Sequence, residues 1–226
     1  MTFVHDFLDF GDCDKLGTVT INGRRHYMVN GMPYPSVTTV LGSVPKPALD
    51  EWRAKVGEVE AEKITRMASD RGSALHSLVE LYLLNQPINN REHMPHILQM
   101  FHWVKPHLDK HVGRILGIEC ALYSDSLAMA GRADLIAEWD GEPAIIDFKT
   151  STKQKRREWM DGYFQQCATY SYMVYERIQL MVPKTVLIVA TEATNCAEVF
   201  EERCATRIPE IVEIVAGYQQ KVLTEG

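Results

Sequence analysis

The sequence predicts an α/β fold in which a mixed central sheet is flanked by helices and preceded by an N-terminal hairpin and helical region. Three β-type runs follow one another between residues 114 and 150, an amphipathic helical stretch comes next, and a strongly apolar run, TVLIVA, follows at 185–190. The turn DGEP at 140–143 is short enough to join only antiparallel strands. A helix between two strands is what a parallel crossover requires. The predicted core is therefore αβββαβ, an antiparallel meander plus a parallel strand.

The N-terminal region begins with a predicted hairpin. Residues 17–35 (GTVTINGRRHYMVNGMPYP) alternate strand-forming residues with Asn-Gly pairs at 22–23 and 30–31, and such pairs favour tight hairpin turns. A long helical stretch is expected from about 48 to 84, and a break or bend is expected near 70–72.

A second helix is predicted over residues 92–112. The pattern behind this prediction is apolar residues at helical spacing, namely Ile97, Phe101, Val104 and Leu108. Pro106 lies inside the stretch, and because proline lacks an N–H and clashes with the preceding turn, it should bend or shorten the last turns.

The second half of the chain is richer in β-type runs than the first. Its elements are expected in this order: strands at 114–124, 127–139 and 143–150, a helix at about 158–178, strands at 185–190 and 197–202, and a terminal helix at about 206–222. The chain of 226 residues is long enough to bury one sizeable core. We therefore expect a single domain over 1–226, with an N-terminal hairpin and helical part at 1–112 and the core at 113–226.

Composition limits the classes of function. The chain has 24 Lys and Arg against 30 Asp and Glu, a net charge of -6, so a polyanionic partner would have to be bound locally rather than by a globally basic surface. Lys153, in the run KQKRR, and Arg71 are among the candidates for such binding. No apolar run is long enough to cross a membrane, and the acidic start does not resemble a signal or transit peptide. A cytoplasmic protein without membrane contact is expected. Five cysteines without a CxxC motif fit free thiols.

The motif IIDFKTS at 145–151 places two charged residues at the end of an apolar run. Asp147 and Lys149 are two positions apart, so on a strand they share a face and Phe148 points the other way. One strand earlier, GRADLIA puts Asp134 in a run that is otherwise fit for burial. The hairpin can bring Asp134 and Asp147 together at one end, as a divalent cation with oxygen ligands requires. Such a cation would remove the repulsion between the two carboxylates. Lys149 could act protonated, by orienting water or stabilising phosphate charge, or act as a base with a depressed pKa.

Further motifs carry a resemblance to a known family. His76 and Glu80 lie at i and i+4 in RGSALHSLVE, and Gln166 and Tyr170 lie in QQCATY after the DFK motif. With Asp134 and Asp147-Phe148-Lys149, they resemble the PD-(D/E)xK nucleases of the RecB-type exonuclease branch. The stretch YPSVTTVLGSVPKPALDEW at 34–52 is similar to the corresponding stretch in mitochondrial genome maintenance exonucleases and their phage relatives.

The resemblance implies roles for individual residues. His76, Asp134 and Asp147 would hold one or two Mg²⁺ or Mn²⁺ ions, with the Phe148 carbonyl as a further ligand. Asp134, Asp147 and Lys149 would be the catalytic set, with Lys149 serving the attacking water and the scissile phosphate. The residues expected at the DNA are Gln166, Tyr170, Thr150, Ser151, Lys153 and Arg71.

Alternatives remain open for single residues and for the whole chain. Glu119 on the first meander strand is either a further metal ligand or an edge-strand charge. His76 alone could be a satisfied histidine, and the acidic pair favours the ligand. The resemblance implies a metal-dependent deoxyribonuclease, an exonuclease on single-stranded DNA or DNA ends in replication, recombination or repair. The other hypotheses are an endonuclease of the same superfamily and a non-catalytic nucleic-acid-binding module. The sequence sets neither polarity nor oligomeric state.

Overall fold

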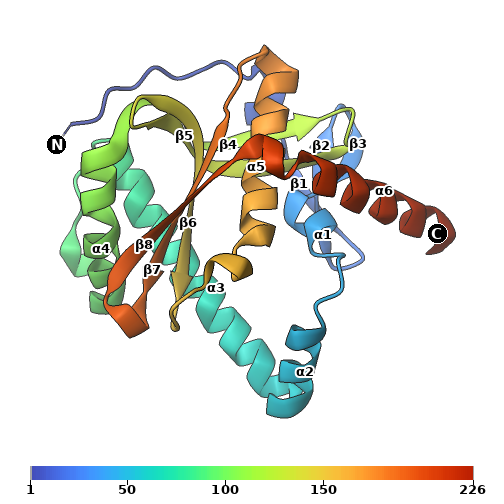
Figure 1. Ribbon diagram of the computed structural model, residues 1–226, viewed down its shortest axis with the longest axis horizontal. Coiled ribbons are helices and arrows are strands. Elements are labelled where there is room, and N and C mark those ends of the chain that lie inside the picture. The colour runs from blue at the N-terminus through green and yellow to red at the C-terminus, as the bar shows by residue number, and fades with distance from the viewer. Residues whose placement is uncertain (1, 226) are drawn as a thin grey trace.

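Five strands form the central sheet, in the order β4-β5-β6-β7-β8 (Figure 1). The computed structural model describes residues 2–225. Every neighbouring pair in the sheet is antiparallel except β6 and β7, which are parallel. The predicted mixed sheet with an antiparallel meander and a parallel crossover is therefore confirmed. The strands are β4 (Val112–Ser124), β5 (Met129–Trp139), β6 (Glu142–Ser151), β7 (Lys184–Thr191) and β8 (Cys196–Arg203).

Helices cover both faces of the sheet. On one face, α3 (Glu58–Leu83) and α4 (Pro95–His111) pack against residues such as Ile146 and Ile188. On the other face, α5 (Asp161–Ile178) packs against Ile145 and Leu187, and α6 (Ile208–Glu225) extends this layer (Figure 1). Because β6 and β7 are buried on both sides, their sequences are nearly continuous apolar runs. Asp147 interrupts one of those runs.

A separate three-stranded antiparallel sheet consists of β1 (Thr18–Ile21), β2 (Arg24–Val29) and β3 (Met32–Pro35). The Asn-Gly pairs at 22–23 and 30–31 occupy its two turns, and all four residues have φ between 50° and 80°. Positive φ at both central residues is what a type I′ hairpin needs, which explains why Asn-Gly occurs at these points. The predicted hairpin region is confirmed.

The expected break near 70–72 is wrong. The helical stretch is instead divided at Gly57, whose φ of 85° no helix allows, into α2 (Pro47–Val56) and α3. Helix α3 runs on through Gly72. A glycine inside a helix destabilises it by about 1 kcal/mol relative to alanine. The burial of Leu75 and Leu78 just beyond Gly72 stabilises the helix by more than that.

The expected shortening of the next helix is also wrong. Helix α4 continues past Pro106 to His111, because Val104 and Leu108 on either side of the proline are fully buried and hold the last turns in place. The short helix α1 (Val37–Leu41) follows the small sheet and begins at Ser36, whose hydroxyl accepts a hydrogen bond from the Thr39 amide. Among the described residues, no helix is long and apolar enough to span a membrane.

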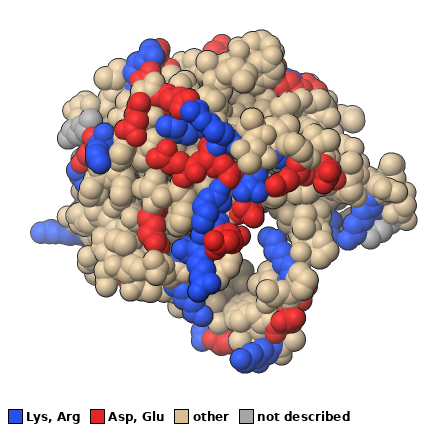
Figure 2. Space-filling view, viewed as in Figure 1, with Lys and Arg blue, Asp and Glu red and all other residues tan. Residues whose placement is uncertain are grey.

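Helices α2 and the first half of α3 form a hairpin that projects from the body of the molecule (Figure 1). No residue of α2 is buried, and in α3 the first buried residue after Ala61 is Leu75. The space-filling view is hollowed between this projecting hairpin and the body, and basic side chains lie on either side of the hollow (Figure 2).

Candidate active site

The two aspartates meet where β5 and β6 separate. The paired register of the two strands ends at Leu135 opposite Ile146, so Asp134 and Asp147 are the next residues on each strand. There the Phe148 amide donates a hydrogen bond to the Asp134 carboxylate, 3.0 Å away, in place of the regular ladder. The hairpin thus brings both carboxylates to one end of the sheet.

The Asp147 carboxylate is buried, and few polar groups compensate for its loss of hydration. The residue is 2% exposed, and apart from the Lys149 ammonium no described residue donates a hydrogen bond to its carboxylate. Its partner is the Lys149 ammonium, with which it forms an ion pair. Burial raises the pKa of Asp147 to about 6, Lys149 opposes that rise, and Asp134 adds to it. A carboxylate has about four lone-pair sites, so pairing with one ammonium leaves it the capacity to bind a divalent cation.

Lys149 lies beside Asp147 on the face of the sheet that α5 covers, and its ammonium is 5.0 Å from the centre of the Tyr163 ring. Burial alone would lower the pKa of this lysine, but the Asp147 and Asp134 carboxylates outweigh burial and raise the pKa. Of the two roles that the sequence leaves open for Lys149, this environment favours the protonated one.

His76 comes from α3 and reaches the same point. Its Nε2 lies 2.7 Å from the Phe148 carbonyl oxygen, and its Nδ1 lies 3.6 Å from Asp134 Oδ2 and 3.9 Å from Glu119 Oε1. If Nε2 donates to the carbonyl, Nδ1 keeps its lone pair toward the two carboxylates. The carbonyl oxygen retains a second lone pair for a further ligand.

Glu119 adopts an unusual backbone conformation in β4. Its φ is 49°, although its neighbours Ile118 and Cys120 pair regularly with β5. Left-handed φ is uncommon for a residue other than glycine and clusters at functional sites. Burial, followed by the nearby Asp134 carboxylate, raises the pKa of Glu119. The side chain is therefore turned into the acidic cluster.

The donor set fits a hard divalent cation. Ligand atoms of His76, Glu119 and Asp134 lie within 4.8 Å of one another. Asp147 is not a member of that cluster in the part of the chain that the structure describes, although it follows the end of the β5-β6 register just as Asp134 does. Carboxylate and carbonyl oxygens with one imidazole suit Mg²⁺ or Mn²⁺ better than the thiolate-rich sets typical of structural zinc. Which of the two ions is bound stays a prediction.

The acidic cluster opens into a hollow of about 420 Å³, which we call the catalytic hollow. It is also lined by Lys149, Gln166 and Tyr170. Sequence reasoning missed its other polar and basic lining residues. Arg132 could have been found, because it lies two positions before Asp134 and so shares its strand face, whereas nothing local singled out the rest. The missed residues are Arg25, Tyr27, Thr38, Ser73, Ser77 and Arg132.

Gln166 and Tyr170 lie one turn apart on α5, and the Gln166 amide donates to the Tyr170 hydroxyl at 3.3 Å. Tyr170 is buried, and burial raises its pKa. It fits only because Gly131 is opposite: a Cβ on that glycine would lie 2.7 Å from Tyr170 Cε1. Both residues line the catalytic hollow, and their contact with DNA stays a prediction.

The other residues expected at the DNA do not line the catalytic hollow. Arg71 donates to the Thr150 hydroxyl at 3.2 Å and pairs with Glu192 at 3.5 Å. Ser151 is buried and its hydroxyl closes a turn with the Lys153 backbone. The Lys153 side chain is exposed. Contact of these four residues with DNA stays a prediction.

Comparison with protein families identifies one match. A sequence profile described as the PD-(D/E)XK nuclease superfamily matches residues 90–223. A search of curated proteins finds no match. Among solved structures, the chain is similar to one titled "Crystal structure of SSO0001", with 16% identity, a TM-score of 0.42, and coverage of 82% of this chain and 74% of that one.

Proposed function

The chain belongs to the PD-(D/E)XK nuclease superfamily, whose members depend on divalent metal ions, and from that premise we propose that it is an exonuclease of the RecB-type branch that degrades single-stranded DNA from an end. The observation that carries the proposal is the convergence of His76, Asp134, Asp147 and Lys149 at the opening of the β5-β6 hairpin. The resemblance to this branch lies in one feature: a helix places a histidine next to two aspartates that come from two neighbouring strands. The expected cofactor is Mg²⁺ or Mn²⁺.

His76, Asp134 and Asp147 would hold the ion, with Glu119 and the Phe148 carbonyl in reach as further ligands. When bound, it would activate water and neutralise phosphate charge. The Lys149 ammonium would donate hydrogen bonds to the attacking water and to a phosphate oxygen. Arg25 and Arg132 line the same hollow and would attract the phosphate backbone to it.

A preference for single strands rests on the projecting hairpin of α2 and α3. A strand that reaches the catalytic hollow beneath this hairpin would have to enter by an end, and a duplex would be too wide to follow it. The hollowed surface between hairpin and body, with basic side chains on either side, supports this path (Figure 2).

The test is a comparison of four substrates that carry the same sequence: linear single-stranded DNA labelled at the 5′ end, the same DNA labelled at the 3′ end, circular single-stranded DNA and closed circular duplex. We expect metal-dependent degradation of the linear strands alone, with the label that is released first giving the polarity. Cleavage of both circles as fast as the linear strand would contradict the exonuclease proposal and favour an endonuclease. Binding in Ca²⁺ without cleavage in Mg²⁺ or Mn²⁺ would favour the binding module.

A further inference from the structure

A second hollow of about 460 Å³ adjoins the catalytic hollow, and we call it the tryptophan hollow. The two share Thr38 and Gln166 in their linings. One wall is the segment between α1 and α2, including Lys46, and the other is the start of α5 with Trp159 and Tyr163 before and within it. A ligand that fills the catalytic hollow could therefore continue past Gln166 into this space. Its volume is in the range of ordinary small-ligand sites.

Trp159 is unusually exposed for its type. It is 57% accessible, and the guanidinium of Arg156 lies over its ring at 5.6 Å from the ring centre. Tryptophan is normally largely buried, since exposing so large an apolar ring forgoes its burial energy. A ring that keeps a cation over it and lines a hollow next to a phosphate-binding site is suited to stack on a base, because base stacking and cation–π contacts recur together in single-strand binding.

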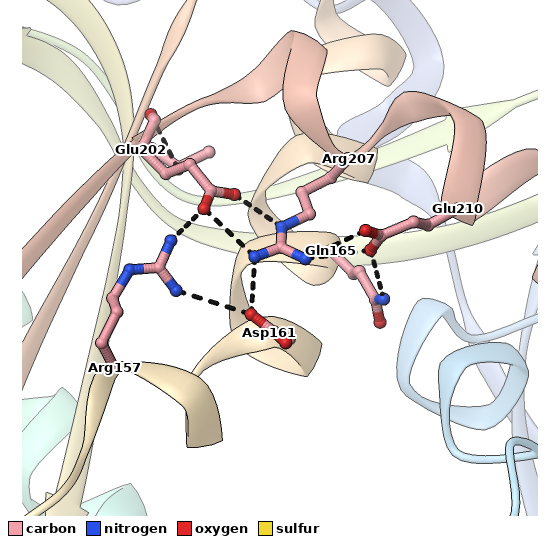
Figure 3. Close-up of polar contacts among 7 residues, drawn as sticks. Arg157, Asp161, Gln165, Glu202, Arg207 and Glu210 are labelled. Carbon is pink, nitrogen blue, oxygen red and sulfur yellow. Dashed lines mark hydrogen bonds and ion pairs between the residues drawn. The ribbon is translucent and has the colours of Figure 1, made fainter.

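The turn that carries Trp159 is held by an ionic network (Figure 3). Arg157 pairs with Glu202 at the end of β8 and lies 4.1 Å from the centre of the buried Phe164 ring. Arg207 bonds the same glutamate at 2.6 Å and Asp161 at 2.5 Å. Residues of the short 3₁₀ turn at 157–159 are thus tied to β8, to the start of α5 and to the turn before α6.

This network has two consequences. Arg157, although it belongs to the basic run KQKRR, is engaged by Glu202 and Asp161 and so is not presented to a phosphate. Because the turn is fixed, the backbone that carries Trp159 is already in place before a ligand binds. Binding to such a pre-organised residue costs less conformational entropy than binding to a flexible one. The remaining walls of the tryptophan hollow offer the Lys46 ammonium for a phosphate. The Gln165 and Gln166 amide nitrogens already donate to Glu210 and Tyr170, so the amide oxygens are the groups left to accept hydrogen bonds from base edges.

We propose that Trp159 is a stacking platform for a nucleobase of the bound strand, one subsite removed from the scissile phosphate. The proposal rests on the proposed function, because it takes the catalytic hollow as the site of the scissile phosphate. Trp159 is a positioning residue here: it holds the strand in register and touches no reacting atom. Stacking of this kind tolerates any base, so it would bind without sequence preference.

The experiment varies both the substrate and the protein. A linear single strand is prepared in versions that each lack one base near the end while keeping the phosphate backbone. Wild type, Trp159→Ala, Trp159→Phe and Tyr175→Ala are compared on every version, with KM and kcat measured separately. Tyr175 is a matched control, since it is an exposed aromatic residue on α5 that lines neither hollow.

Trp159→Ala should raise KM about tenfold on the intact strand with little change in kcat, because loss of one base stack weakens binding by roughly five- to a hundredfold. Trp159→Phe should recover most of this loss, and Tyr175→Ala should behave as wild type. When the missing base is the one that stacks on Trp159, the KM of wild type should rise by the same factor. The KM of Trp159→Ala should not rise further on that substrate.

Three results would overturn the proposal: an unchanged KM in Trp159→Ala, an equal additional loss in Trp159→Ala for every missing base, or no recovery in Trp159→Phe. Each leaves the proposed function intact as long as wild type degrades the strand. Absence of degradation by wild type would instead refute the proposed function. Thermal unfolding of each variant separates loss of fold from loss of binding, since an exposed side chain should change Tm by no more than about 2 °C.

Discussion

A divalent cation should stabilise this fold, because the acidic cluster is held together at a cost in free energy. Burial, opposed by Lys149 and reinforced by Asp134, raises the pKa of Asp147 from its ordinary 3.8 to about 6. Keeping this carboxylate ionised at pH 7 therefore costs about 3 kcal/mol, at 1.36 kcal/mol per pKa unit. A cation that binds the Asp147 carboxylate removes most of that cost. Saturating Ca²⁺ should raise Tm by about 5–10 °C, at 2–4 °C per kcal/mol for a chain of this length.

The same carboxyl group gives the effect a pH dependence of known sign. Between pH 4 and 6 the folded protein keeps a proton on Asp147 that the unfolded chain has lost. In metal-free buffer the contribution of Asp147 to stability is therefore greatest below about pH 4 and is lost as the pH rises to about 6. Because the ion competes with this proton, the Ca²⁺ effect on Tm should be small at pH 4.5 and complete at pH 7.

Differential scanning fluorimetry with Ca²⁺ or EDTA at these two pH values would measure the effect. Asp134→Asn is the informative variant, since its amide oxygen can still accept the Phe148 hydrogen bond while one charge is removed. It should lose most of the Ca²⁺ effect, and Glu213→Gln, an exposed change on α6, should keep all of it. An equal Ca²⁺ effect in Asp134→Asn and wild type, or none in wild type at pH 7, would refute the reasoning.

Three further predictions concern other parts of the site and its support. His76→Ala should raise the Mn²⁺ concentration for half-maximal cleavage by at least about tenfold, because one ligand and its contact with the Phe148 carbonyl are lost; an unchanged Mn²⁺ titration would remove His76 from the ligand set. Gly131→Ala should destabilise the fold by about 1–3 kcal/mol in chemical denaturation, because the new methyl group would overlap Tyr170; unchanged stability would mean that Tyr170 moves freely. Arg207→Met should lower stability by about 1–3 kcal/mol, since Glu202 and Asp161 each lose a charge-assisted hydrogen bond; a neutral effect would mean that the network in Figure 3 contributes nothing to the fold.

Much of the catalytic core could be predicted from the sequence, because its signals are local. The short turn at 140–143 could only make a hairpin, and strand periodicity then placed Asp134 beside Asp147 and Lys149 on the face of Asp147. The parallel crossover from β6 to β7 followed from the helical stretch between them. These rules need only the identity of a few neighbouring residues.

What could not be predicted depends on contacts between distant segments. Gly57 and Gly72 both lie in a predicted helical stretch, and no local pattern distinguishes them. The helix ends at Gly57 and continues through Gly72, where the burial of Leu75 in the next turn stabilises it. Arg25 reaches the catalytic hollow from the small sheet, and no local pattern announces that position. The engagement of Arg157 likewise depends on Glu202, which is 45 residues away.

We propose above that Asp134, Asp147 and Lys149 form a metal-dependent phosphodiesterase site. The most direct test is the initial rate of single-strand degradation by wild type, Lys149→Met and Lys110→Met, each in Mn²⁺ and in EDTA. Lys110 is the control, because it is an exposed lysine on α4 that does not line the catalytic hollow. Wild type and Lys110→Met should degrade the strand in Mn²⁺ only, and Lys149→Met should be slower by about 10²–10³, the usual effect of removing one group that stabilises transition-state charge. Cleavage by Lys149→Met at the wild-type rate, or cleavage by wild type that persists in EDTA, would contradict the account.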